Sequence, residues 1–118
     1  MGNENTAIKP IIIRDEEKGA VYTLEYSRET VKWAESRGFD ISDVERFPMI
    51  KFPELFYYAF RMHHRNISRQ QTDKILDEIG GISKALSERL GQLYAAPYTT
   101  LFTDDEETPK NAKMTVEL

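Results

Sequence analysis

The sequence predicts an α+β domain that is mainly helical, in which an N-terminal β-hairpin is followed by about five short helices. Two short segments near the N-terminus, residues 11–13 and 21–26, are β-branched or alternate between apolar and polar side chains. From residue 27 onward, apolar side chains recur every three or four positions, which is the spacing of amphipathic helices. Serines precede most of these helical stretches, and glycines or prolines follow most of them. We expect a single compact domain over residues 1–102 of the 118-residue chain.

The hairpin is expected over residues 10–26. Its first strand is the run of isoleucines at 11–13, and residues 14–19 form a polar turn that ends in glycine. In the second strand, apolar or aromatic side chains at positions 22, 24 and 26 alternate with Thr23 and Glu25, so one face is expected to be buried. A hairpin alone is only marginally stable, and this one must therefore pack on the helices or gain a partner strand.

The helical part is expected over residues 27–102. Ser27 is a predicted N-cap, and Val31 and Ala34 mark the buried stripe of the helix that follows. Ser68 and Gln71 have the spacing of a capping box. The first predicted helix covers residues 28–37, and a short second helix starts at Asp40 or Ser42 and is ended by Pro48. The third runs from Pro53 to about Arg65. The fourth runs from Ser68 to the turn at Gly80 and Gly81, and the fifth starts at Ser83 and is stopped or kinked by Pro97.

The C-terminal residues 103–118 are expected to form an acidic, flexible tail. They hold five acidic and two basic side chains, and four of the acidic ones are consecutive at positions 104–107. The last five residues, 114–118, alternate between apolar and polar side chains, which is compatible with a small edge strand.

The composition excludes several classes of function. The chain has no cysteine, so disulfides, thiolate metal sites, iron–sulfur clusters and cysteine nucleophiles are excluded, and a reducing compartment fits. Its net charge is −4 and its pI is about 5.2, which argues against general nucleic-acid binding. No apolar run approaches the ~20 residues of a membrane span, and the N-terminus lacks the pattern of a signal peptide. We therefore expect no membrane association.

The predicted third helix is the most unusual segment. Residues 55–60 are all apolar or aromatic, so they cover most of the circumference of a helix. Such a helix is either central to the core or shared between the core and a partner, and both interpretations stay open. We place Phe56 on the inner face, and Tyr57 and Tyr58 at an interface, because tyrosine hydroxyls tolerate partial hydration. The candidate protein-interaction residues are Phe52, Phe56, Tyr57, Tyr58, Arg61 and Arg65.

No segment has the pattern of a catalytic or metal site. His63 and His64 are adjacent, so on a helix their side chains point about 100° apart and do not readily chelate one metal ion. His63 is expected to be half-buried, with its hydrogen bonds satisfied. Gly80 and Gly81 lie between helices and indicate a turn rather than a phosphate-binding loop. We therefore expect no enzyme activity, no catalytic residue, no cofactor and no metal.

Residues 68–94 leave a second function open, because a helix, a glycine turn and a helix also make up a DNA-binding helix-turn-helix. The pattern fits poorly. Leu76 takes a crowded site where a small residue is usual, and Arg89 takes a position where a buried apolar residue is expected. The second helix offers Lys84 and Arg89 against Glu88, which is a poor recognition face. The basic side chains that remain to contact phosphate are few: Arg61, His64, Arg65 and Arg69.

Several short blocks, taken in order, resemble a known class of phage proteins. The first is 22–40 (YTLEYSRETVKWAESRGFD), and the second is 53–65 (PELFYYAFRMHHR). They are followed by IGG at 79–81 and LYAAPY at 93–98. Together they are similar to the small tail assembly chaperones of tailed phages and prophages of Gram-positive bacteria, which are encoded between the major tail protein and the tape measure protein. The resemblance covers about residues 20–118 and depends on the order of the blocks.

The resemblance implies a non-enzymatic role. Proteins of this class coat the long, helical tape measure protein while tail tube subunits polymerise around it, and they are then displaced. The implied partner is therefore the tape measure protein, with self-association between copies, a location in the host bacterial cytoplasm and absence from the mature virion. The aromatic helix and the hairpin edge are the two candidate binding surfaces. A structural tail or connector subunit stays open as another alternative, beside the DNA-binding regulator.

Overall fold

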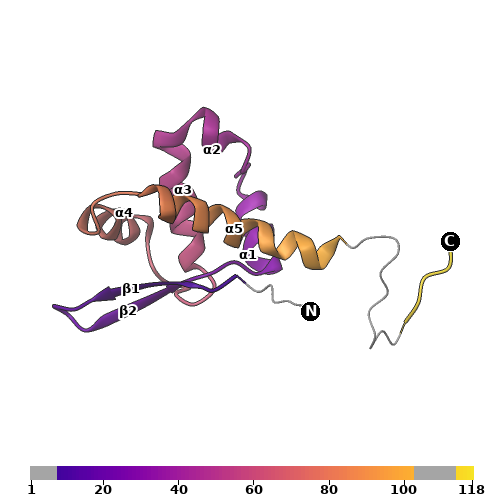
Figure 1. Ribbon diagram of the computed structural model, residues 1–118, viewed down its shortest axis with the longest axis horizontal. Helices are drawn as coiled ribbons and strands as arrows, with labels where there is room; N and C mark the ends of the chain where they lie inside the picture. Colours follow the sequence, from indigo (N-terminus) through magenta and orange to yellow (C-terminus); the bar gives the residue numbers. More distant parts are fainter. Residues whose placement is uncertain (1–7, 103–113) are drawn as a thin grey trace.

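The computed structural model describes residues 8–102 and 114–118, and in this part of the chain an N-terminal hairpin is followed by five helices (Figure 1). The predicted class, α+β and mainly α, is confirmed. The elements are the strands β1 (Ile11–Asp15) and β2 (Ala20–Leu24) and the helices α1 (Arg28–Ser36), α2 (Asp43–Arg46), α3 (Pro48–Phe60), α4 (Arg69–Glu78) and α5 (Lys84–Leu101).

The two strands pair in an antiparallel sheet, in which Ile11 lies opposite Leu24. Side chains at positions 22, 24 and 26 are buried or half-buried against the helices, as the alternation predicts. On the other face, Ile12 and Val21 are 45% and 47% exposed. The hairpin therefore has one face in the core and one in contact with solvent, on which Ile12 and Val21 lie beside Arg14 and Thr23.

Three helices, α1, α4 and α5, begin where their capping residues predict, and at α5 the Ser83 hydroxyl oxygen accepts a hydrogen bond from the Leu86 N–H at 3.1 Å. The Ser27 hydroxyl oxygen accepts a hydrogen bond from the Thr30 N–H at 3.2 Å, and the predicted inner stripe of α1 is buried. At α4 the capping box is complete. Ser68 Oγ accepts from the Gln71 N–H, while the Gln71 side chain accepts from the Ser68 N–H. Local side-chain chemistry is sufficient to place all three helix starts.

The bounds of α3 differ from the prediction at both ends. The helix begins at Pro48 rather than at Pro53, so Pro48 starts α3 instead of ending α2. Pro48 lies in the first turn, where a missing N–H costs nothing. Pro53 lies inside the helix and removes a hydrogen bond to the turn of Met49, which is 89% exposed and open to water. The helix ends at Phe60 rather than near Arg65, because the Arg61 and His63 N–H groups bond to carbonyls three residues back, and of the next N–H groups only that of His64 makes a four-residue bond, to the Phe60 carbonyl.

The helix α5 runs through Pro97 to its end at Leu101, so a stop at Pro97 is wrong. Pro97 is buried, and packing of its ring helps to offset the missing helical hydrogen bond. The last turn of α5 is also hydrogen-bonded to α1, because Arg28 Nε donates to Thr100 Oγ1 at 2.9 Å. Contacts distant in the sequence therefore keep this segment helical.

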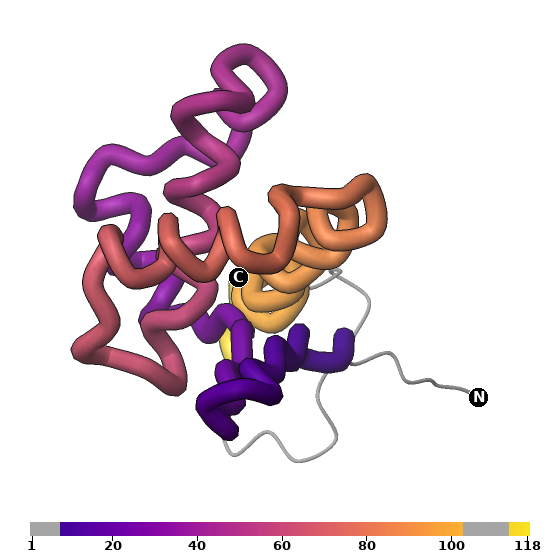
Figure 2. Tube along the Cα trace, turned by 90° about the vertical axis from the view of Figure 1, so that its left-hand side faces the viewer, coloured from indigo at the N-terminus to yellow at the C-terminus, as the bar shows by residue number. Residues whose placement is uncertain are grey.

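The helix α3 lies at the centre of the core. It contacts β2 and each of the other four described helices. Figure 2 shows the hairpin beneath α5, which is seen nearly end-on, with α4 above them. The largest fully buried side chains of the cluster come from β2, α3 and α5: Leu24, Leu55, Phe56, Phe60, Leu90, Leu93 and Tyr94.

The C-terminal prediction is partly overturned. Residues 114–118 form no strand, so the predicted edge strand is wrong. Their side chains are exposed, and within the described residues no strand lies beside them to complete a ladder. The acidic run at 104–107, on which the flexible tail was predicted, lies outside the described residues. None of the helices in residues 8–102 is long and apolar enough to cross a membrane.

Candidate protein-interaction site

The structure buries two of the six predicted interaction residues. Phe56 is fully buried and Tyr58 is 7% exposed, so neither presents its side chain to a partner. They are buried because α3 is surrounded by its neighbours. The Tyr58 ring packs edge-on against Trp33 and Phe39, with ring centroids 5.2 Å apart in each pair. Phe52 is half-buried against the core.

The other three predicted residues lie around Trp33, where α1 meets the end of α3. The guanidinium carbon of Arg61 is 4.2 Å from the centre of the Trp33 ring, and that of Arg37 is 5.1 Å away. The Tyr57 ring centroid lies 6.1 Å from that of Trp33, and Arg61 Nη1 donates to the Arg65 carbonyl at 3.4 Å. We call this group the aromatic–arginine patch: Trp33, Arg37, Tyr57, Arg61 and Arg65.

The patch combines the three residue types that contribute most to protein interfaces, namely tryptophan, tyrosine and arginine. Trp33 and Tyr57 are half-buried, so their rings offer apolar area whose position is already fixed. Stacking on Trp33 restrains the guanidinium group of Arg61, while its N–H groups can still donate to a carboxylate. A hollow of about 430 Å³ adjoins the patch and is lined also by Glu29 and Met62. Such a surface fits a partner with both apolar and acidic side chains.

Like Arg37, Trp33 belongs to the patch but is not among the six interaction residues that the sequence predicts. It is the only tryptophan of the chain and lies beside the inner stripe of α1, which is a weak signal for an interface. Its contacts with Tyr57 and Arg61 depend on the packing of α1 against α3. No local pattern in the sequence predicts that contact.

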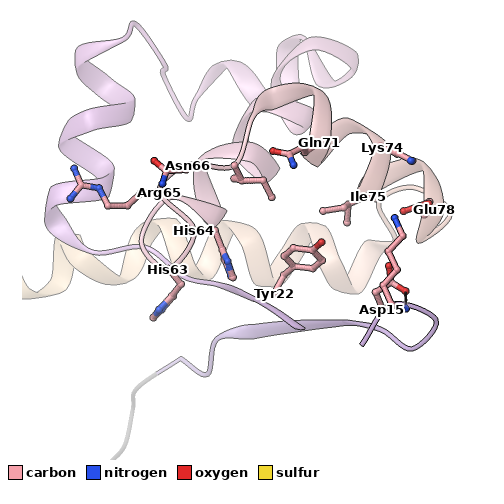
Figure 3. Close-up of a pocket in the computed structure, with 12 residues that line it drawn as sticks. Asp15, Tyr22, His63, His64, Arg65, Asn66, Gln71, Lys74, Ile75 and Glu78 are labelled. Atoms are coloured by element: carbon pink, nitrogen blue, oxygen red, sulfur yellow. Dashed lines mark hydrogen bonds between the residues drawn. The ribbon is translucent and has the colours of Figure 1, made fainter. Parts of the chain in front are cut away.

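A second hollow, of about 580 Å³, lies between the hairpin and α4 (Figure 3). Tyr22 of β2 and Ile75 of α4 point into it from opposite sides. The charged side chains that line it include Lys18 of the hairpin turn and Lys74 of α4. Arg65 lines both this groove and the hollow at the patch, so the two surfaces are continuous across the loop after α3.

The two histidines point in different directions and have separate partners. His64 Nε2 accepts a hydrogen bond from the Thr23 N–H at 2.9 Å, and its ring centroid lies 5.5 Å from that of Tyr22. Burial, together with the neighbouring His63, lowers the pKa of His64 and favours the neutral ring. His63 instead bonds to Glu25 at 2.8 Å, and its side chain is 38% exposed. The half-buried histidine is therefore His64, not His63 as predicted, because α3 ends before both.

No metal centre is found around the histidines. In the part of the chain that the structure describes, no group of three or more histidine, cysteine, aspartate or glutamate side chains is placed to hold a metal ion.

The packing of α4 and α5 offers little support for the helix-turn-helix alternative. The helix α4 packs on α3, whereas α5 packs on α1 and α3. Arg89 of α5 donates from Nη2 to the carbonyls of Lys9 and Pro10, at 2.5 and 3.3 Å. A basic side chain of the would-be recognition helix therefore holds the start of the hairpin instead of facing a groove of DNA.

Comparison with known protein families assigns the chain to one family. The family described as "Domain of unknown function (DUF5055)" matches residues 4–118. No curated protein and no solved structure gives a significant match. The chain belongs to the DUF5055 family.

Proposed function

We propose that this DUF5055 protein is a tail assembly chaperone of a phage or prophage, which binds the tape measure protein before the tail tube closes around it. In this proposal the role is non-enzymatic, copies of the chain self-associate, and the protein acts in the host cytoplasm and is left out of the virion. The observation that carries the proposal is the aromatic–arginine patch. It joins the two longest blocks that resemble such chaperones, 22–40 and 53–65.

The chemistry of the patch suits a long helical client. An amphipathic helix offers a stripe of apolar side chains flanked by charged ones. Trp33 and Tyr57 supply rings for the stripe, and Arg37 and Arg61 supply donors for acidic side chains beside it. Because few side chains take part, the contact is weak and reversible, as displacement by tail tube subunits requires.

An apolar corner at the junction of α2 and α3 supports the same role. Phe47, Met49 and Ile50 are 46%, 89% and 58% exposed. Large apolar side chains that are exposed together favour association with a partner. The flexible methionine side chain adapts to irregular surfaces, so the corner suits a client whose apolar residues vary along its length.

Co-expression with the neighbouring tape measure protein tests the proposal. We expect the two proteins to co-purify and the soluble fraction of the tape measure protein to increase. The double variant Trp33→Ala, Arg61→Ala should weaken the complex about tenfold or more, because it removes two residues of the types that dominate interfaces. The matched control is Lys32→Ala, an exposed position adjacent to Trp33 in α1. Absence of a complex contradicts the proposal, and equal binding by both variants contradicts the role of the patch.

A structural tail or connector subunit also binds tail proteins, but it remains in the mature virion. Mass spectrometry of purified virions and of the assembling lysate separates the two roles. Under the proposal, the chain is abundant in the lysate and absent from the virions. A fixed number of copies per virion identifies a structural subunit instead.

A further inference from the structure

The outer edge of β2 is covered by the protein itself. The Thr23 N–H donates to His64 Nε2 at 2.9 Å, and the Glu25 N–H donates to the Ala59 carbonyl at 2.9 Å. Residues 23 and 25 therefore turn their backbone groups away from β1. The end of α3 and the loop after it take the place of a further strand on this side.

The outer edge of β1 is open. In the hairpin register, Ile12 lies opposite Thr23 and Arg14 lies opposite Val21. Because backbone direction alternates along a strand, Ile12 and Arg14 also turn their N–H and C=O groups outward. Within residues 8–102 and 114–118, these four groups have no hydrogen-bond partner. The two open positions differ in character: Ile12 is apolar and 45% exposed, and Arg14 is charged.

We propose that β1 pairs with β1 of a second copy, antiparallel, about a two-fold axis at Ile13. In this register Ile12 of each copy lies opposite Arg14 of the other, and each open N–H meets an open C=O. The two hairpins then form one four-stranded sheet. The start of β1 is already held in place, because Arg89 binds the Lys9 and Pro10 carbonyls.

The neighbouring registers satisfy the edge less well. A shift that places Ile12 opposite Ile12 brings Pro10, which has no N–H, opposite Arg14. A shift that places Arg14 opposite Arg14 sets two like charges against each other. Of these three registers, only the one with its axis at Ile13 avoids both the missing N–H of Pro10 opposite Arg14 and the pairing of two arginines. In this register the open groups of one copy also have the same spacing as those of the other copy. This self-complementarity is the reason that the proposed occupant is a second copy.

Sedimentation equilibrium of the purified full chain, without a client, tests the pairing. Ile12→Pro removes an N–H that the hairpin does not use, so the fold is kept and dimerisation should weaken about tenfold or more. The matched control is Val21→Pro, which changes an outward position on β2 and should dimerise as the unmodified chain does. Circular dichroism checks that both variants fold. A chain that is monomeric at all concentrations, or a dimer that Ile12→Pro leaves unchanged, overturns the proposal.

Cysteine cross-linking tests the register independently, because the chain has no cysteine of its own. Opposite Cβ atoms at the axis lie roughly 4.5–5.5 Å apart, close enough for a disulfide after small adjustment. Oxidised Ile13→Cys should therefore form a covalent dimer, whereas Thr23→Cys, on the covered strand, should not. The reverse result overturns the register. The inference deepens the self-association within the proposed function. Since no client is present, its failure is distinguishable from a failure of client binding.

Discussion

Phe56 and Tyr57 are adjacent in α3, yet Phe56 is fully buried and Tyr57 is half-buried at the surface. The Phe56 ring packs edge-on against Phe60, with centroids 5.1 Å apart. We expect Phe56→Ala to lower the free energy of unfolding by about 3–5 kcal/mol, because it leaves a cavity in a packed core. Tyr57→Ala should cost about 1 kcal/mol and mainly reduce client binding. Denaturant unfolding measures both, and a loss below ~1 kcal/mol for Phe56→Ala contradicts its place in the core.

His64 makes stability depend on pH in a predictable direction. Its pKa is lowered by burial and by His63, so the folded protein binds fewer protons at this site than the unfolded chain. The contribution of His64 is therefore complete above a pH of about 6.5 and decreases as the pH falls toward the lowered value. Protonation also prevents Nε2 from accepting the hydrogen bond of Thr23.

The variant His64→Gln keeps an acceptor at this position and does not titrate. We expect its stability to decline less than that of the unmodified chain between pH 7 and pH 5, when both are measured by thermal unfolding. The matched variant His63→Gln changes a more exposed ring, whose partner is Glu25. A decline in His64→Gln as steep as in the unmodified chain would show that other groups cause the pH dependence.

Among the elements, α4 depends most clearly on a cap. Both hydrogen bonds of the capping box between Ser68 and Gln71 are present. Ser68→Ala removes the hydroxyl acceptor and should cost about 1 kcal/mol of stability, whereas Ser68→Thr keeps an acceptor and should cost less. Hydrogen exchange of the first turn of α4 provides a local readout. Equal protection in the two variants is incompatible with a role for the cap.

The contrast between caps and prolines shows how far the sequence predicts the elements. Ser27 and Ser68 bond to N–H groups three residues ahead, so their effect is readable from spacing alone. Spacing alone does not predict the effect of the prolines at positions 48, 53 and 97. Each position is compatible with a helix start, a stop or an interior site, and packing against distant segments decides between them.

The same limit applies to the candidate site. Tyr57, Arg61 and Arg65 were found because they follow one another on a helix and its end. The sequence does not predict the role of Trp33 in the patch, because that role depends on the packing of α1 against α3. It does not predict the groove either, because the groove depends on how α4 lies relative to the hairpin. The burial of Tyr58 has the same origin, since its neighbours come from α1 and from Phe39.

For the whole molecule, the loop after α3 lies between the aromatic–arginine patch and the hairpin. It carries Arg65 of the aromatic–arginine patch and also His64, which covers the edge of β2. The open edge of β1 lies on the other side of the hairpin. A dimer formed through β1 therefore leaves both patches free. Two patches on one dimer increase the effective affinity for a long client with repeated helical segments.

The two proposed surfaces, the aromatic–arginine patch and the open edge of β1, should respond differently to salt, because the first would use exposed charges and the second would use main-chain hydrogen bonds between isoleucine-rich strands. The Debye length falls from about 10 Å at 0.1 M to about 3 Å at 1 M, which screens contacts between arginine and acidic side chains. We expect client binding to weaken over this range and dimerisation to stay nearly constant. Trp33 is the only tryptophan of this chain, so with a client segment that contains no tryptophan its fluorescence reports binding at the patch, and sedimentation reports the dimer. Arg61→Gln should reduce the salt dependence of client binding only. A parallel loss of both interactions would mean that client and second copy share one surface.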